Sequence, residues 1–184
     1  MNIHKTSIDG LLLVEQQKFK DNRGYFSEVY QKAKFFDLGI QINFVQDNHS
    51  RSIKNVLRGM HFQIKQPQAQ LLTVIHGKIF DVAVDLRSSS PTFMEWFGIE
   101  LSDSNKYQLF MPHGIAHGFC VLSDIADLHY KTTHFYSPDD EGGLNWQDPD
   151  ISIKWPIKNP ILSERDLSFP FLTEIQKSKL PQGF

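Results

Sequence analysis

Short segments in which apolar and polar residues alternate follow one another along most of the chain. In the clearest of them, apolar side chains occupy the even positions from Phe80 to Leu86, and Asp81 and Asp85 occupy odd positions. Alternation with a period of two places the two sets on opposite faces of a strand. Segments of this kind predict strands over 24–30, 42–50, 56–63, 71–75, 78–87, 93–101, 107–111, 119–122 and 126–136.

Turn residues separate these segments at intervals of about 8–12 residues, which indicates an all-β sandwich or barrel. One internal helix is predicted over 31–38, closed by Gly39 at the usual C-terminal position. A second short helix is predicted near 172–179. From residue 147 onward the segments shorten and prolines accumulate, so we expect 147–184 to form a C-terminal tail that packs on a single domain spanning 1–184.

Composition narrows the function classes. The formal net charge is −2, whereas proteins whose main task is nucleic-acid binding usually show a basic face. The single cysteine, Cys120, lies in an apolar run and is expected to be buried. Because no apolar run approaches 18 residues and the N-terminus is unlike a signal peptide, we expect a cytoplasmic protein without a membrane partner.

Two strands present polar or aromatic side chains at regular spacing. Gln46, Asn48 and Ser50 share one face of the strand 42–50, which suits either a polar pocket wall or a solvent-facing side. Tyr130 and Tyr136 share a face of 126–136 and would lie about 20 Å apart on a straight strand. That separation would let one tyrosine meet a sugar while the other stacks on a base.

The segment Arg58 to Gln63 concentrates candidate chemistry. His61 is the side chain most easily poised as a base near neutral pH, and Arg58 can hold an anionic group with two donors. The two residues are three positions apart, so a regular strand would send them to opposite faces. Either they serve different sites, or Gly59 marks a β-bulge that redirects one of them.

The run from Pro112 to His117 resembles the second motif of cupin-type jelly rolls, many of which bind a metal. The expected ligand set is incomplete, because the next same-face position after His61 is Gln63, an amide. We therefore predict no metal and no other cofactor. No Gly-x-Ser-x-Gly segment supports a serine nucleophile. General acid–base catalysis remains, with His61 as the base candidate and Tyr130 as the acid candidate.

Motifs over nearly the whole chain resemble those of dTDP-4-dehydrorhamnose 3,5-epimerases. The matching segments are DNRGYF at 21–26, FVQDNHS at 44–50, LRGMHFQ at 57–63, FDVAVDLR at 80–87, SPTF at 90–93, PHGIAHGF at 112–119, YK at 130–131 and LSERD at 162–166.

The resemblance implies a cupin-like jelly-roll homodimer that inverts C3 and C5 of a dTDP-linked 4-keto-6-deoxyhexose in dTDP-rhamnose and O-antigen biosynthesis. Carried over by position, His61 is the base, Asp166 is its partner carboxylate and Tyr130 is the acid. Some contacts would come from the neighbouring subunit. The residues implied to contact the nucleotide sugar are Arg23, Phe26, Glu28, Gln46, Asn48, Arg58, His117, Tyr136, which would stack on thymine, and Glu141.

Two positions depart from the family pattern. Gln70 stands where the family normally has a lysine, so a neutral amide replaces a charge near the substrate, and Arg58 or a shifted Lys65 would have to compensate. Arg165 stands where many members have lysine. Two alternatives stay open. Gln70 motivates the first, a related epimerase that takes another base or sugar or inverts C3 alone. The second is a non-catalytic sugar-binding jelly roll or structural dimer.

Overall fold

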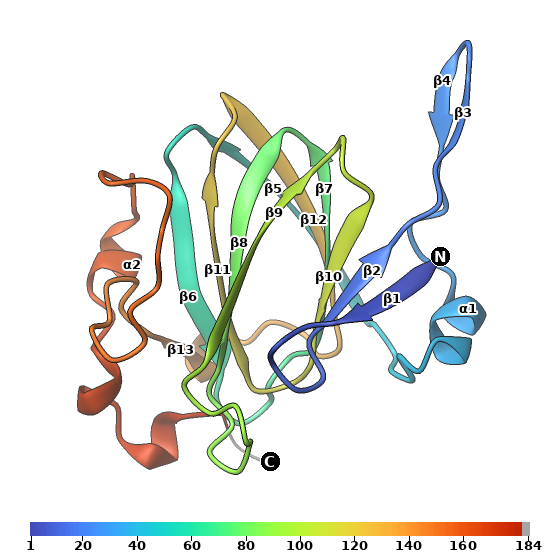
Figure 1. Cartoon of the computed structure of the whole chain (residues 1–184). Coiled ribbons are helices and arrows are strands. Elements are labelled where there is room, and N and C mark those ends of the chain that lie inside the picture. The colour runs from blue at the N-terminus through green and yellow to red at the C-terminus, as the bar shows by residue number, and fades with distance from the viewer. Residues whose placement is uncertain (182–184) are drawn as a thin grey trace.

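Two antiparallel sheets packed face to face form the body of the protein. The computed structural model describes residues 1–181 (Figure 1). The six-stranded sheet has the order β1-β2-β10-β7-β12-β5. Its strands are β1 (Asn2–Lys5), β2 (Leu12–Glu15), β10 (Tyr107–Met111), β7 (Gln70–His76), β12 (Ile125–Thr132) and β5 (Gln46–Ile53). The five-stranded sheet has the order β13-β6-β11-β8-β9. Its strands are β13 (Glu141–Gly143), β6 (Leu57–Gln63), β11 (Ile115–Val121), β8 (Lys78–Asp85) and β9 (Trp96–Ser102).

The main core lies between the two sheets. Leu72 and Leu128 from the six-stranded sheet pack against Ile79, Leu101 and Phe119 from the five-stranded sheet, and all five are nearly or fully buried. The all-β sandwich predicted from strand spacing is thereby confirmed.

The C-terminal segment covers the outer face of the five-stranded sheet (Figure 1). Val82 and Val84 of β8 pack there with Ile151 and Trp155. Because this face of β8 is covered, the opposite face, which carries Asp81, turns toward the interior of the sandwich. The tail contains α2 (Glu164–Leu167) and the 3-10 turns η2 (Leu172–Glu174) and η3 (Lys177–Lys179). The last three residues of the predicted tail, 182–184, lie outside the described residues.

Helix α1 (Lys32–Asp37) packs on the outer face of the six-stranded sheet through the buried Phe35. The helix is confirmed where the sequence predicts it. The Gln31 side chain caps its N-terminus by accepting a hydrogen bond from the Lys34 N–H, and Gly39 follows its C-terminus with φ +92°.

Several predicted boundaries are wrong. The strand predicted over 24–30 is only β4 (Gly24–Phe26), paired with β3 (Phe19–Asp21) in a separate hairpin. Strand β11 begins at Ile115, inside the segment interpreted as a turn. Strand β12 ends at Thr132, because the next residue turns away and donates its N–H to the Ala69 carbonyl. The helix predicted over 172–179 is two 3-10 turns, whereas α2 was missed.

No helix among residues 1–181 is long and apolar enough to span a membrane.

Candidate active site

A cavity of about 310 Å³ opens between the two sheets and gathers most of the predicted site residues. Both sheets and the segments beside them contribute to its lining. The polar lining consists of Gln46, Asn48, Ser50, Arg58, His61, Gln63, Gln68, Gln70, His117, Tyr130, Tyr136, Glu141 and Arg165. The apolar lining includes Phe62, Pro67, Ile115, Phe119 and Leu128.

His61 on β6 is held by the carboxylate of Asp166, the partner that the family resemblance implies. Nε2 of His61 lies 2.8 Å from Oδ1 of Asp166. Asp166 belongs to α2, where the Ser163 hydroxyl caps the helix by accepting from the Asp166 N–H. Burial alone would raise the pKa of Asp166, but the hydrogen bond and charge of His61, the Gly59 N–H and Arg165 together lower it below its usual value. Asp166 is therefore ionised and fixes the orientation of the imidazole.

Arg58 and His61 line the same cavity although they are three positions apart on β6. The register between β6 and β11 shifts, because Arg58 pairs with Phe119 whereas His61 pairs with His117. Gly59 lies in this bulge with φ +126°, and a Cβ there would come within 2.5 Å of Gly118 Cα. The bulge predicted at Gly59 is thus present, and its backbone admits only glycine.

His117 forms a second His–Asp pair beside the first. It is the cross-strand partner of His61, and its Nε2 lies 2.9 Å from Oδ2 of Asp81 on β8. Asp81 has no exposed surface, and its other oxygen is buried without a hydrogen-bond partner among the described residues. Burial raises the pKa of Asp81 above its usual value despite the opposing influence of His117. The sequence placed Asp81 on the face opposite the apolar residues of β8 but gave no sign of this partner.

Tyr130 enters the cavity from the opposite sheet. It lies on β12, with Asn48 of β5 as its cross-strand partner. Burial raises the pKa of the Tyr130 hydroxyl, and Glu141 and Tyr136 raise it further while Arg58 opposes them. The hydroxyl therefore keeps its proton at neutral pH, as an acid requires.

Tyr136, Glu141 and Arg165 form a connected group at the edge of the cavity. The Tyr136 hydroxyl donates to Oε2 of Glu141 at 3.2 Å, and Nη1 of Arg165 donates to the same oxygen at 2.6 Å. Tyr136 does not share a strand with Tyr130 as predicted, because β12 ends at Thr132; its N–H instead donates to the side chain of Gln46. With 46% of its surface exposed, Tyr136 offers a ring face for stacking.

Gln70 at the start of β7 lines the cavity, so the departure from the family pattern falls inside the site. Its Oε1 is buried and has no hydrogen-bond partner among residues 1–181. The Lys65 side chain is not among the residues that line the cavity, and the Lys65 N–H donates to Asp140. Of the two predicted substitutes for the missing lysine, only Arg58 is in place; its Nε donates to the Ser52 hydroxyl at 2.9 Å.

Arg23, Phe26 and Glu28 do not reach the cavity within this chain. Arg23 and Phe26 belong to the β3–β4 hairpin, which projects away from the sandwich (Figure 1). The Arg23 side chain is 85% exposed and, within the described part of the chain, pairs only with Asp21, and Phe26 is 69% exposed. Glu28 bonds Lys34 at 2.7 Å. None of the three residues is among those that line the cavity.

Sequence reasoning missed part of the lining. Ile115 lies in a segment whose glycines predict a turn, and Phe119 begins a predicted strand but has no chemical feature that marks it as a site residue. Pro67 and Gln68 lie in a loop that shows no period. Among residues 1–181, no three His, Cys, Asp or Glu side chains gather as metal ligands would.

Comparisons with known proteins show the family to which this chain belongs. The family model for dTDP-4-dehydrorhamnose 3,5-epimerase matches residues 5–174. The dTDP-4-dehydrorhamnose 3,5-epimerase of Escherichia coli K12 is 48% identical over 183 residues, which cover 98% of this chain and 99% of that protein. The dTDP-4-dehydrorhamnose 3-epimerase of Streptomyces niveus is 36% identical over 98% of this chain and 88% of its own length.

A solved structure gives the same result for the fold. The crystal structure of the 3,5-epimerase of Legionella pneumophila, in complex with dTDP-4-keto-L-rhamnose, superposes with a TM-score of 0.95 at 45% identity and covers 100% of this chain and 98% of its own. The sandwich is therefore of the cupin-like kind that the sequence predicts. From these matches, the chain belongs to the dTDP-4-dehydrorhamnose 3,5-epimerase family and is an epimerase of the isomerase class.

Proposed function

We propose that this chain converts dTDP-4-dehydro-6-deoxy-D-glucose into dTDP-4-dehydro-L-rhamnose by inverting C3 and C5 without a cofactor. One observation carries the proposal: His61, backed by Asp166, and Tyr130 line a single cavity from opposite sheets. Inversion of a carbon needs a base on one side of the sugar ring and an acid on the other.

The chemistry follows from the C4 ketone. His61 removes the proton from C3 or C5, and the C–H electron pair forms a carbon–carbon double bond while the carbonyl electrons move onto the C4 oxygen. The resulting enolate collapses back to the ketone as the Tyr130 hydroxyl delivers its proton to the other face of the same carbon. The imidazolium and the tyrosinate then exchange protons with solvent, so the enzyme returns to its starting state.

The remaining lining residues suit a nucleotide-linked sugar. Arg58 supplies a cation, while Gln46 and Asn48 supply amides at hydrogen-bonding distance from each other, 2.9 Å. We assign Tyr136 to stacking on thymine, since stacking of a base on an aromatic ring contributes about 1–3 kcal/mol. We also propose a homodimer in which Arg23, Phe26 and Glu28 complete the site of the other subunit. The hairpin side chains of Arg23 and Phe26 are exposed in the single chain, and none of the three residues lines its own cavity.

A second candidate is a related epimerase that inverts C3 alone or takes another sugar or base. Two observations favour it: the neutral Gln70 in the cavity, and the relative from Streptomyces niveus named as a 3-epimerase. Incubation with dTDP-4-keto-6-deoxyglucose in deuterated water, followed by NMR of the sugar, separates the candidates. Deuterium at both C3 and C5 is expected. Label at C3 alone would support the second candidate, and no label with this nucleotide but uptake with another would reassign the base.

A further inference from the structure

Two His–Asp pairs stand side by side in the wall of the cavity. His61 and His117 are direct partners across β6 and β11, so their Cβ atoms lie about 4.5–5.5 Å apart. In each residue Nε2 contacts a carboxylate, at 2.8 Å from Asp166 and at 2.9 Å from Asp81. In neither residue does Nδ1 hydrogen-bond to any part of residues 1–181, so in both it is the nitrogen left for a ligand.

The two carboxylates have different surroundings. Asp166 has, besides His61, the Gly59 N–H at 3.4 Å and Nε of Arg165 at 3.6 Å. Among the described residues, the Asp81 side chain hydrogen-bonds His117 alone, has no exposed surface, and keeps one oxygen buried without a partner. An uncompensated buried negative charge destabilises the folded protein. The Asp81 pair is therefore less able than the Asp166 pair to carry a net negative charge.

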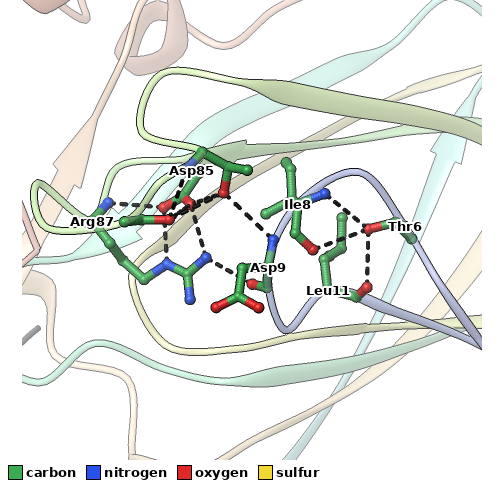
Figure 2. Close-up of polar contacts among 8 residues, drawn as sticks. Thr6, Ile8, Asp9, Leu11, Asp85 and Arg87 are labelled. Atoms are coloured by element: carbon green, nitrogen blue, oxygen red, sulfur yellow. Dashed lines mark hydrogen bonds and ion pairs between the residues drawn. The ribbon is translucent and has the colours of Figure 1, made fainter.

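Asp85 shows how this fold supports a buried carboxylate that is ionised. It lies four residues beyond Asp81 on the same face of β8 and is equally unexposed. Arg87 donates to both of its oxygens at 2.9 and 2.8 Å (Figure 2). Ser90 and Thr92 add hydroxyl donors at 2.6 and 2.7 Å. These hydrogen bonds outweigh the effect of burial and lower the pKa of Asp85. No arginine, lysine or hydroxyl of residues 1–181 bonds Asp81.

We propose that the His117–Asp81 pair holds one proton more than the His61–Asp166 pair, so that Nδ1 of His117 carries a hydrogen and donates it to the C4 oxygen of the substrate. The neutral pair can be carboxylic acid with imidazole or carboxylate with imidazolium. In both forms Nδ1 is protonated, because the contact with Asp81 accounts for Nε2 only. This step rests on the proposed function, and Asp81 acts in it as a positioning residue.

The arrangement gives neighbouring histidines opposite tasks. With Asp166 ionised, His61 donates its Nε2 hydrogen and offers a lone pair at Nδ1 for the carbon acid. C4, the ketone carbon, is bonded directly to the carbon that gives its proton to His61. The C4 oxygen therefore lies within reach of the neighbouring imidazole of His117. His117 can then stabilise the enolate by a hydrogen bond, without transferring its proton.

Paired amide substitutions test this assignment. Asp166→Asn keeps its oxygen on the Gly59 N–H, turns its amide toward Nε2 of His61 and forces hydrogen onto Nδ1. The rate should fall about 10⁴-fold, as expected for a base in the wrong tautomer. Asp81→Asn can donate to Nε2 of His117 and so preserve a hydrogen on Nδ1, which limits the loss to about tenfold or less, whereas Asp81→Leu should lose about 10²–10³-fold. Equal losses for Asp81→Asn and Asp166→Asn would overturn the proposal.

A second measurement does not depend on activity. The ring nitrogens of ¹⁵N-histidine-labelled protein are recorded by NMR without substrate, and the His117 signals are assigned by their loss in His117→Gln. A hydrogen on Nδ1 of His117 is expected. A hydrogen on Nε2 alone would overturn the proposal even in an active enzyme. Conversely, a wild-type protein that exchanges no deuterium, yet shows Nδ1 protonated, would refute the proposed function and leave the protonation state of the pair intact.

Discussion

The two walls of the cavity differ in the kind of side chain that they contribute. The five-stranded wall brings His61, His117 and Arg58, and carboxylates support both of its histidines. The six-stranded wall brings neutral hydrogen-bonding groups, namely Gln46, Asn48, Ser50, Gln70 and Tyr130. Carboxylates behind the five-stranded wall thus set the protonation of its histidines. The other wall presents the phenol of Tyr130, whose pKa burial raises further above neutral pH.

This asymmetry explains how one small cavity can act as a base and as an acid without a metal or an organic cofactor in the proposed reaction. Two groups with well-separated proton affinities must face the same ring, and different environments produce that separation. Because the groups stand on different sheets, packing between the sheets fixes their separation. We therefore expect variants of the two walls to fail in different ways.

The largest effect is expected at His61. His61→Gln removes the only candidate base, so turnover should fall about 10⁴-fold and deuterium exchange at C3 and C5 should disappear with it. The matched variant on the same wall, His117→Gln, should lose about 10²–10³-fold while retaining measurable exchange, because it removes a donor and leaves the base. An NMR time course in deuterated water measures both. If His117→Gln lost exchange more completely than His61→Gln, the two roles would have to be reversed.

Tyr130→Phe should uncouple exchange from inversion. The variant keeps His61, so a proton can leave the carbon and a deuteron can return to the same face, but the opposite face has lost its donor. We expect inversion to slow by about 10²–10³-fold while wash-in of deuterium without inversion continues. The ratio of exchanged to inverted sugar, read from one NMR spectrum, is the measurement. A parallel loss of both would show that Tyr130 contributes to binding or to enolate formation rather than to reprotonation.

How the walls assemble could be predicted only in part. The alternation from Phe80 to Leu86 predicts strand β8 and separates Asp81 and Asp85 from the apolar face. It does not show that a distant tail covers the apolar face and leaves the aspartates inside, because that depends on packing between segments far apart in sequence. A period-two pattern identifies faces but not which face is inner.

The bulge at Gly59 and the position of Tyr136 depend on contacts with other segments, which the sequence of a single strand does not show. Gly59 could be proposed as a bulge, but the need for glycine arises from Gly118 on the neighbouring strand, 2.5 Å from the position of a Cβ. Tyr136 was placed on a straight strand, although the chain turns after Thr132 and brings the ring to Glu141 instead. Local periodicity carries no information about such turns or about partners from later in the chain.

Asp85→Asn tests whether a buried carboxylate with a full set of hydrogen-bond donors contributes more to the free energy of unfolding than Asp81 on the same strand. The substitution leaves Arg87 without its charged partner in a site that has no exposed carboxylate surface, so the free energy of unfolding should fall by about 3–5 kcal/mol at pH 7. Asp81→Asn should cost much less, because the proposed pair is already neutral. Urea unfolding of the wild type, Asp85→Asn and Asp81→Asn measures the three free energies of unfolding.

The difference in unfolding free energy between wild type and Asp85→Asn should change with pH in a definite direction. The pKa of Asp85 in the folded state lies below its unfolded value, so its contribution is present above about pH 4 and is lost as the pH falls through the folded pKa. The gap between wild type and Asp85→Asn should therefore narrow in acid. A gap that widened as the pH fell toward 4 would show instead that the pKa of Asp85 is raised in the native protein.

The smallest effect is expected from placing a charge on the neutral wall. Gln70→Lys adds a cation beside a cavity where Arg58 and the His117–Asp81 pair already face the developing enolate, so the rate should rise less than about threefold. Gln70→Met, which is similar in length and uncharged, separates the effect of charge from that of the buried amide oxygen. Steady-state kinetics with the keto sugar measures both variants. A gain of tenfold or more would mean that the present donors leave the enolate only partly stabilised, and that the neutral wall limits the rate.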